Sequence, residues 1–319
     1  MNEDNILLSA RGLVKEFPAK GHKKVHAVSG IDLDIYAGET LALVGESGCG
    51  KSTLGRTLIQ LIPPTAGTVT FEGKEITGMR AKDFAPYRRQ MQLIFQDPYA
   101  SLDPRMTVRD IVAEPLTTYK LCPTSEAVTQ RVRELLDAVG IPDEFLYRYP
   151  HQFSGGQRQR IGIARAIALQ PKLIICDEPV SALDVSVQSQ ILNLLKDLQE
   201  RFGLTYLFIS HDLSVVRFMA DRVAVMFLGK LCEVGETGTI YRRPAHPYTQ
   251  FLLNAIPKAD PRLREKEKPL LQGEIPSPID VPSGCRFHTR CPYATDRCRT
   301  EEPPLREVDG RLAACFKAD

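Results

Sequence analysis

The sequence predicts an α/β protein with a mostly parallel sheet, built around a loop that wraps a phosphate group. The first observation is residues 45–52 (GESGCGKS), which match the pattern G-x-x-x-x-G-K-[ST] at every fixed position. The second is their context, because the apolar run 40–44 precedes them and a helix-like segment, 53–60, follows them. The third is the alternation of buried-strand runs with helical segments, which is typical of parallel sheets with active groups at the strands' carboxyl ends.

The residue types in this loop suit a nucleotide phosphate. Glycines let the loop wrap tightly, so that successive backbone N–H groups face the β-phosphate, and the following helix N-terminus adds partial positive charge. Lys51 supplies a charge for the β- and γ-phosphates, and the Ser52 hydroxyl can ligate Mg²⁺. The predicted nucleotide contacts here are Gly45, Ser47, Gly48, Gly50, Lys51, Ser52 and Thr53.

Composition sets the class of protein. With 319 residues, 43% hydrophobic and 25% charged, the chain fits one large globular domain plus an appendage, or two domains. A net charge of +2 gives no broad basic field for nucleic acid. Residues 1–5 lack the features of a signal peptide, and no apolar run approaches the roughly 18 residues of a membrane span. We expect a soluble, intracellular chain that meets a membrane only through partners.

Periodicity and turn residues give the order of elements. We expect strands at 6–17, 25–36, 68–72, 91–95, 171–176, 204–210, 222–228 and 230–234, and helices at 53–60, 108–119, 125–139, 155–169, 187–202 and 247–255. Residues 1–256 therefore form a nucleotide-binding domain with a helical subdomain at about 97–168. From residue 257 a charged, proline-rich linker leads into a small cysteine-bearing tail, 257–319.

Two carboxylates follow a strand that is apolar on both faces. Asp177 stands at the carboxyl end of this strand, where it can hold Mg²⁺. Glu178 lies beside it and can polarise an attacking water. After a buried strand in a phosphate-loop protein, this pair predicts a hydrolytic centre rather than a solvated turn.

A second glycine-containing motif predicts a second anion site. Ser154 can cap the helix that begins at Gly155, and Gly155 and Gly156 allow close backbone approach, with Gln157 completing the motif. One chain does not need two phosphate cradles for one ATP. Two chains facing each other do, if each completes the other's site.

Together these motifs resemble the ATPase subunits of ABC transporters over residues 6 to about 255. In family order they are Walker A at 45–52, the Q-loop residue Gln96, the signature at 154–157, Walker B at 173–177 with Glu178, the D-loop at 181–184 and the H-loop residue His211. The resemblance implies an ABC-type nucleotide-binding domain with a RecA-like, mostly parallel core, an antiparallel β subdomain and a helical subdomain. Phe153 stands where the family usually has leucine.

The resemblance also implies roles. Glu178 would be the general base, His211 would contact the γ-phosphate and position the water, and Gln96 would join Mg²⁺ to the γ-phosphate and sense the membrane partner. Ser154 and Gly156 would clasp ATP held by the opposite subunit, with Asp184 at the dimer interface.

Phe17, at the end of the first strand, has two readings. By the resemblance it stacks on adenine, whereas by its position alone it is equally well a core residue at a strand end.

Three further stretches narrow the family. Residues 96–105, 243–249 and 276–292 resemble ATPases of dipeptide and oligopeptide importers, nearest to the "F" ATPases of dipeptide permeases. This implies ATP-driven import of short peptides at the cytoplasmic face of the bacterial inner membrane. The implied partners are a paralogous ATPase, two membrane permease subunits and a periplasmic binding protein. Nickel, haem and glutathione importers share the pattern, so the cargo stays open.

Two other classes of function fit less well. A soluble ABC ATPase acting on nucleic acid or ribosomes usually carries two cassettes or a coiled-coil insertion, and this sequence has neither. A regulatory, non-hydrolysing partner would have a damaged Walker B or signature motif, and both are intact.

The tail carries four cysteines, Cys285, Cys291, Cys298 and Cys315. Four thiolates can hold Zn²⁺ or an iron–sulfur cluster, and about 40 proline-rich residues with little core of their own would need such a staple. Zinc sites more often show tight C-x₂₋₄-C pairs, so the looser spacing favours a [4Fe–4S] cluster. Zinc and free thiols are the alternatives, and His288 is expected at the surface rather than as a ligand.

Overall fold

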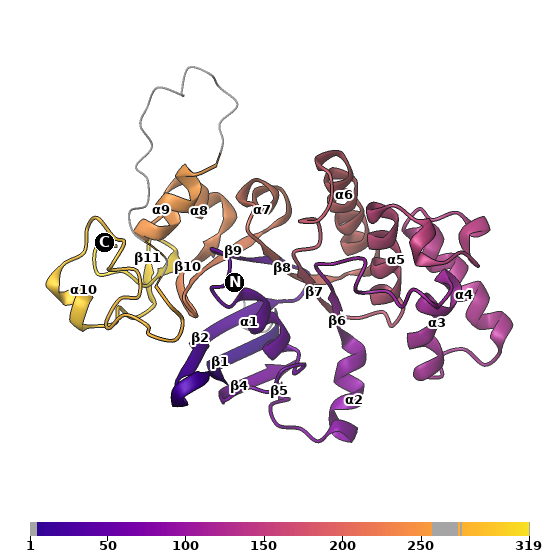
Figure 1. Cartoon of the computed structure of the whole chain (residues 1–319), viewed down its shortest axis with the longest axis horizontal. Helices are drawn as coiled ribbons and strands as arrows, with labels where there is room; N and C mark the ends of the chain where they lie inside the picture. Colours follow the sequence, from indigo (N-terminus) through magenta and orange to yellow (C-terminus); the bar gives the residue numbers. More distant parts are fainter. Residues whose placement is uncertain (1–4, 257–273, 275, 319) are drawn as a thin grey trace, which may run out of the picture. The chain divides into compact units, whose positions relative to one another are not determined.

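The computed structural model describes residues 5–256, 274 and 276–318, and the chain divides into two compact units (Figure 1). The first unit consists of two separate stretches, residues 1–78 and 208–319, and the second unit is the stretch between them, 79–207. None of the helices in the described part of the chain has the length and apolar character that crossing a membrane requires.

An antiparallel sheet opens the first unit. Its strands are β1 (Ile6–Pro18), β2 (Lys24–Tyr36), β4 (Ala66–Phe71) and β5 (Lys74–Glu75), in the order β2-β1-β4-β5. Strands β1 and β2 match the expected strands to within a residue and are joined by a short 3₁₀ turn, η2 (Lys20–His22). The apolar positions of β1, such as Leu8, Ala10 and Leu13, are fully buried, so one face of this sheet is core.

A second sheet of the first unit carries the phosphate loop. Strand β3 (Thr40–Val44) pairs in parallel with β9 (Arg222–Phe227), which pairs antiparallel with β10 (Lys230–Glu236). The tail extends this sheet, because β12 (Arg311–Ala313) pairs with β10, and β11 (Arg306–Val308) pairs with β12. The helices of the unit are α1 (Lys51–Leu58), α7 (Leu213–Met219), α8 (Thr237–Arg242), α9 (Pro247–Asn254) and α10 (Asp296–Thr300).

The second unit combines two paired strands with a set of helices. Strands β6 (Met91–Ile94) and β7 (Leu173–Asp177) pair in parallel. Its helices are α2 (Ala81–Gln90), α3 (Val108–Thr118), α4 (Ser125–Ala138), α5 (Gly155–Ile167) and α6 (Val185–Phe202), with 3₁₀ turns η3 (Asp143–Phe145) and η4 (Pro150–Gln152). Threonine hydroxyls of Thr107 and Thr124 cap α3 and α4 by accepting backbone N–H bonds. Strand β8 (Thr205–Ser210) returns the chain to the first unit.

The cysteine tail shares the core of the first unit. Phe287 is 1% exposed, and its ring lies 5.4 Å from that of Phe227 and 5.3 Å from that of Tyr248, measured between ring centroids. The tail therefore gains most of its apolar burial from β9 and α9, beside a small cluster of its own, Val308, Ala313 and Ala318. The predicted linker falls mostly on 257–273 and 275, which lie outside the described residues.

Candidate functional site

The loop after β3 can be built only with glycine at two of its positions. A Cβ on Gly45 would lie 2.1 Å from the Met226 carbonyl oxygen, and a Cβ on Gly50 would lie 2.0 Å from the Ala27 carbonyl oxygen. Gly50 also has a φ of 105°. These contacts press the loop against β9 and β2, which fixes its backbone as a narrow turn before α1.

Lys51 fills the centre of this turn. Its side chain is buried, and Nζ donates hydrogen bonds to the carbonyl oxygens of Gly45 (2.8 Å) and Glu46 (3.0 Å). An ammonium group held inside a turn of backbone N–H groups makes a concentrated positive site at a helix N-terminus. The loop therefore fits the phosphates of a nucleotide, and Ser52, in the first turn of α1, is placed to offer a hydroxyl to Mg²⁺.

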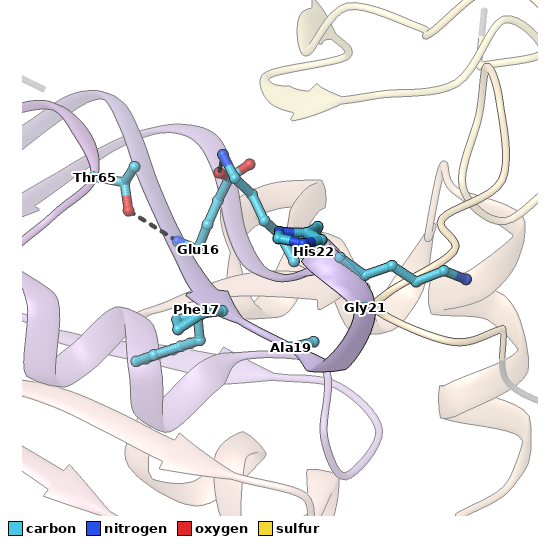
Figure 2. Close-up of a pocket in the computed structure, with 9 residues that line it drawn as sticks. Glu16, Phe17, Ala19, Gly21, His22 and Thr65 are labelled. Atoms are coloured by element: carbon cyan, nitrogen blue, oxygen red, sulfur yellow. Dashed lines mark hydrogen bonds and ion pairs between the residues drawn. The ribbon is translucent and has the colours of Figure 1, made fainter.

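A hollow of about 590 Å³ lies where β1 ends (Figure 2). Phe17 lines it from β1, with Thr65 beside the strand and Lys23, Lys24 and His22 from the turn that follows. The Phe17 ring is half-buried, and the Lys15 ammonium lies 4.9 Å from its centroid. Glu16 also lines the hollow and forms an ion pair with Lys24. An aromatic face in a hollow can stack on a nucleotide base, and this role of Phe17 stays a prediction.

The basic side chains of this hollow are functional candidates that sequence reasoning missed. Residues 20–24 join two strands, and the sequence pattern of this segment indicates a polar, basic turn. Their run of lysine and histidine beside a strand-end aromatic was the available signal.

The second unit carries the carboxylates. Asp177 ends β7 and is 1% exposed, whereas the Glu178 side chain that follows it is half-buried. Gln96 donates a hydrogen bond from Nε2 to Oε2 of Glu178 at 2.9 Å, joining two residues 82 positions apart. Glu178 has a φ of 47°, a left-handed conformation that is strained for a non-glycine residue and occurs preferentially at functional sites. Two of the three predicted catalytic side chains, Gln96 and Glu178, are thus in direct contact.

The signature motif starts α5 as predicted. The Ser154 hydroxyl accepts a hydrogen bond from the Gln157 N–H, and the Gln157 side chain accepts one from the Ser154 N–H, forming a capping box. A Cβ on Gly156 would lie 2.4 Å from Cγ1 of Val187, so glycine lets α5 pack against α6. Ser154 is exposed, as is Asp184 at the N-terminus of α6, so both can face a second subunit.

The motif residues divide between the two units. The phosphate loop, Phe17 and the exposed His211, which follows β8, belong to the first unit. Gln96, Asp177, Glu178, Asp184 and residues 154–157 belong to the second. Their contacts with a nucleotide stay a prediction.

All four tail cysteines line one pocket of about 410 Å³, on the first unit. The Cys285 N–H donates to the Cys298 carbonyl at 2.8 Å, which brings the two ends of this segment together. Desolvation raises the pKa of Cys285 to about 11 and raises the pKa values of Cys291 and Cys315, so the thiols are neutral unless a cation is present. His288 also lines this pocket and is half-buried, and its expected place at the surface rather than as a ligand stays a prediction.

The described residues show less of a metal site than the sequence predicts. Within residues 5–256, 274 and 276–318, no three histidine, cysteine or acidic side chains are arranged to hold a metal ion. All four cysteines line the pocket, and the group that they would hold stays a prediction.

Comparison with known proteins identifies the family. Residues 28–181 match the model of the ABC transporter family, and residues 232–298 match the model described as the oligopeptide/dipeptide transporter C-terminal region. The putative oligopeptide transport ATP-binding protein YkfD of Bacillus subtilis is 54% identical over 97% of this chain and 94% of its own length. The oligopeptide transport ATP-binding protein OppF of Salmonella typhimurium is 52% identical over 93% and 89%.

Solved structures agree with these relatives. A dimeric ATP-binding cassette, MJ0796, bound to ADP and Pi, has a TM-score of 0.66 at 30% identity over 72% of this chain and 99% of its own. CbiO1 of Clostridium perfringens, part of the ABC transporter complex cbiONQ, has the same TM-score at 29% identity over 75% and 92%. The predicted ABC-type fold is confirmed for the matched part, and the chain belongs to the ATP-hydrolysing, ATP-binding subunits of ABC transporters, in their oligopeptide and dipeptide group.

Proposed function

We propose that this chain is the ATP-hydrolysing subunit that powers import of dipeptides and short oligopeptides across a bacterial inner membrane. The observation that carries the proposal is the near full-length similarity to named oligopeptide transport ATP-binding proteins, tail included. The intact motifs support hydrolysis rather than a regulatory role. The chain acts at the cytoplasmic face, held there by membrane permease subunits.

The residues divide the chemistry among them. Lys51 and the N–H groups of the loop hold the phosphates, and Phe17 stacks on the adenine. Ser52, Gln96 and Asp177 are the residues that would hold Mg²⁺, which would supply positive charge to the phosphates. Glu178 accepts a proton from the attacking water, with its carboxylate oriented by Gln96. His211 holds that water against the γ-phosphate.

Assembly follows from the exposed signature motif. Ser154 and the N-terminus of α5 would complete the site of a facing ATPase subunit, a paralogue in the importers that this chain resembles. The dimeric MJ0796 cassette supports this arrangement by its similar fold. A periplasmic binding protein would deliver the peptide to the membrane subunits.

Transport can be tested with the complete importer in proteoliposomes. We expect peptide-loaded binding protein to stimulate ATP hydrolysis and uptake of labelled dipeptide, both lost when this subunit carries Lys51→Ala. Stimulation by RNA, DNA or ribosomes without peptide-dependent uptake would support the alternative class of ABC ATPase. Uptake of nickel, haem or glutathione with no peptide uptake would show that the cargo is different, and the role as the ATPase of an importer would stand.

The four-cysteine pocket is proposed to hold a [4Fe–4S] cluster. The four cysteines are separated by wider sequence spacings than the tight C-x₂₋₄-C pairs of most zinc sites. A multi-iron cluster carries its thiolates further apart, and four cysteines are its usual ligands. The tail's own apolar cluster is small, consisting of Val308, Ala313 and Ala318. Because so small a cluster contributes little to folding, a bound metal group could supply much of the tail's stability.

Metal analysis tests this assignment. In protein purified anaerobically we expect about four irons and four acid-labile sulfides per chain, lost together in Cys298→Ser and retained in Cys122→Ser, which lies in the second unit. Stoichiometric zinc without iron would make the tail a zinc-stapled segment. Absence of both metals would leave four free thiols and would not affect the ATPase assignment.

A further inference from the structure

Glu46, the second residue of the phosphate loop, is held by three different groups of the first unit. Its carboxylate accepts hydrogen bonds from both terminal nitrogens of Arg290, at 2.7 Å and 3.2 Å. Its backbone N–H donates to the Tyr248 hydroxyl at 2.9 Å. Its carbonyl oxygen accepts the bond from Lys51. The side chain, the N–H and the carbonyl of Glu46 are thus each tied to a different residue, Arg290, Tyr248 and Lys51.

The two groups that hold Glu46 from outside the loop come from α9 and the cysteine tail. Arg290 directly precedes Cys291, and its side chain is only 6% exposed, against 22% for Glu46. Tyr248 is fully buried and packs against Phe227 and Phe287. A bidentate guanidinium–carboxylate pair at this depth is geometrically specific, unlike a flexible surface pair.

We propose that Arg290 and Tyr248 are positioning residues for ATP binding, which makes the C-terminal tail a working part of the nucleotide site. The inference rests on the proposed role of the phosphate loop. The two residues fix the start of the loop, so that the N–H groups after Glu46 face the phosphates before ATP arrives. Arg290 also neutralises a carboxylate that would otherwise stand beside the phosphate charges.

The two effects predict an order among variants. Arg290→Met removes the anchor and leaves an uncompensated carboxylate, so we expect the Kd for a fluorescent Mg-ATP analogue on the full chain to rise about tenfold. Glu46→Gln removes only the anchor and should raise Kd less. Adding Glu46→Gln to Arg290→Met should recover part of the affinity. Tyr248→Phe should weaken binding by about threefold.

A matched control separates this effect from loss of the tail's packing. Lys230 and Glu302 form another ion pair between β10 and the tail, distant in sequence from the loop, at 2.5 Å. Glu302→Gln should leave Kd unchanged. In ATPase assays, Arg290→Met should raise KM with kcat retained, whereas partial unfolding would lower kcat at constant KM.

The outcomes are distinct. Equal Kd values for Arg290→Met, Glu302→Gln and the unmodified chain, with binding lost in Lys51→Ala, would overturn this inference alone. Unchanged binding in Lys51→Ala would overturn the proposed nucleotide site as well. If Arg290→Met does not fold, Glu46→Gln breaks the same ion pair from the loop side, and an unchanged Kd there would be equally decisive.

Discussion

Replacing Glu178 by glutamine is expected to lower the rate of ATP hydrolysis by about 10²–10⁴-fold while leaving ATP binding intact. The amide keeps the shape of the side chain and an oxygen that can accept the hydrogen bond from Gln96. It removes only the basicity that takes a proton from water. Because hydrolysis is what reopens an ATP-closed dimer, the variant should also accumulate as an ATP-bound dimer.

Phosphate release and light scattering, each with and without Mg-ATP, measure the two parts of this prediction. Glu144→Gln is the control, since Glu144 is an exposed acidic residue of the same unit. Hydrolysis at the unmodified rate in Glu178→Gln would show that another group takes the proton. If Glu178→Gln loses hydrolysis as expected but forms no ATP-bound dimer, Glu178 would stand as the general base and the proposed dimer would be contradicted.

The second large effect concerns the ion pair that joins the tail to β10. Glu233 is 0% exposed, and its Oε1 lies 3.1 Å from Nε of Arg311 on β12. The same carboxylate accepts backbone N–H bonds from Ala245 and His246. Arg311→Met would leave a buried carboxylate without its cation, which costs about 3–5 kcal/mol of stability.

This loss should be local as well as large. Amides of β10 and β12 should exchange with deuterium much faster in Arg311→Met, and the denaturation midpoint of the first unit should fall. Arg299→Met, which breaks an exposed pair with Asp296, should change neither measurably. Adding Glu233→Gln to Arg311→Met should restore part of the stability, because the unpaired charge is then gone. Equal stability of the two arginine variants would contradict the proposed importance of the buried pair.

The Glu233 carboxylate links the tail to α9, and through α9 to the phosphate loop. Burial lowers the pKa of His246 to about 4, so this ring is neutral at physiological pH, and its Nδ1 accepts the Tyr248 N–H at the start of α9. Glu233 holds the backbone of His246, and Tyr248 holds Glu46. Arg311→Met should therefore also weaken nucleotide binding, though by less than Arg290→Met does.

Features set by neighbouring residues could be predicted from the sequence. The capping box of Ser154 and Gln157 spans one helical turn, so the residue types alone determine it. The loop glycines precede a lysine at fixed spacing, and the strand and helix around them are dictated by apolar runs. These are the parts of the site in which sequence distance and spatial distance coincide.

Features that depend on residues far apart in the sequence could not be predicted. Arg290 and Glu46 are 244 positions apart, and the sequence around neither residue indicates that the two pair. Helix α2 was missed because Pro86 lies inside it and only Phe84 of its residues is buried. Strands β11 and β12 are three residues each, too short for an alternating pattern to be recognised.

The split construction of the first unit has a consequence for synthesis on the ribosome. The phosphate loop is made early, but the residues that close around it, Met226, Tyr248 and Arg290, are made late. At about 5–20 residues per second, some tens of seconds separate the two events. A nascent or prematurely ended chain therefore carries the complete phosphate-loop sequence without its supports. If Arg290 and Tyr248 support the loop as proposed, a chain that ends before residue 248 should bind ATP more weakly than the whole chain.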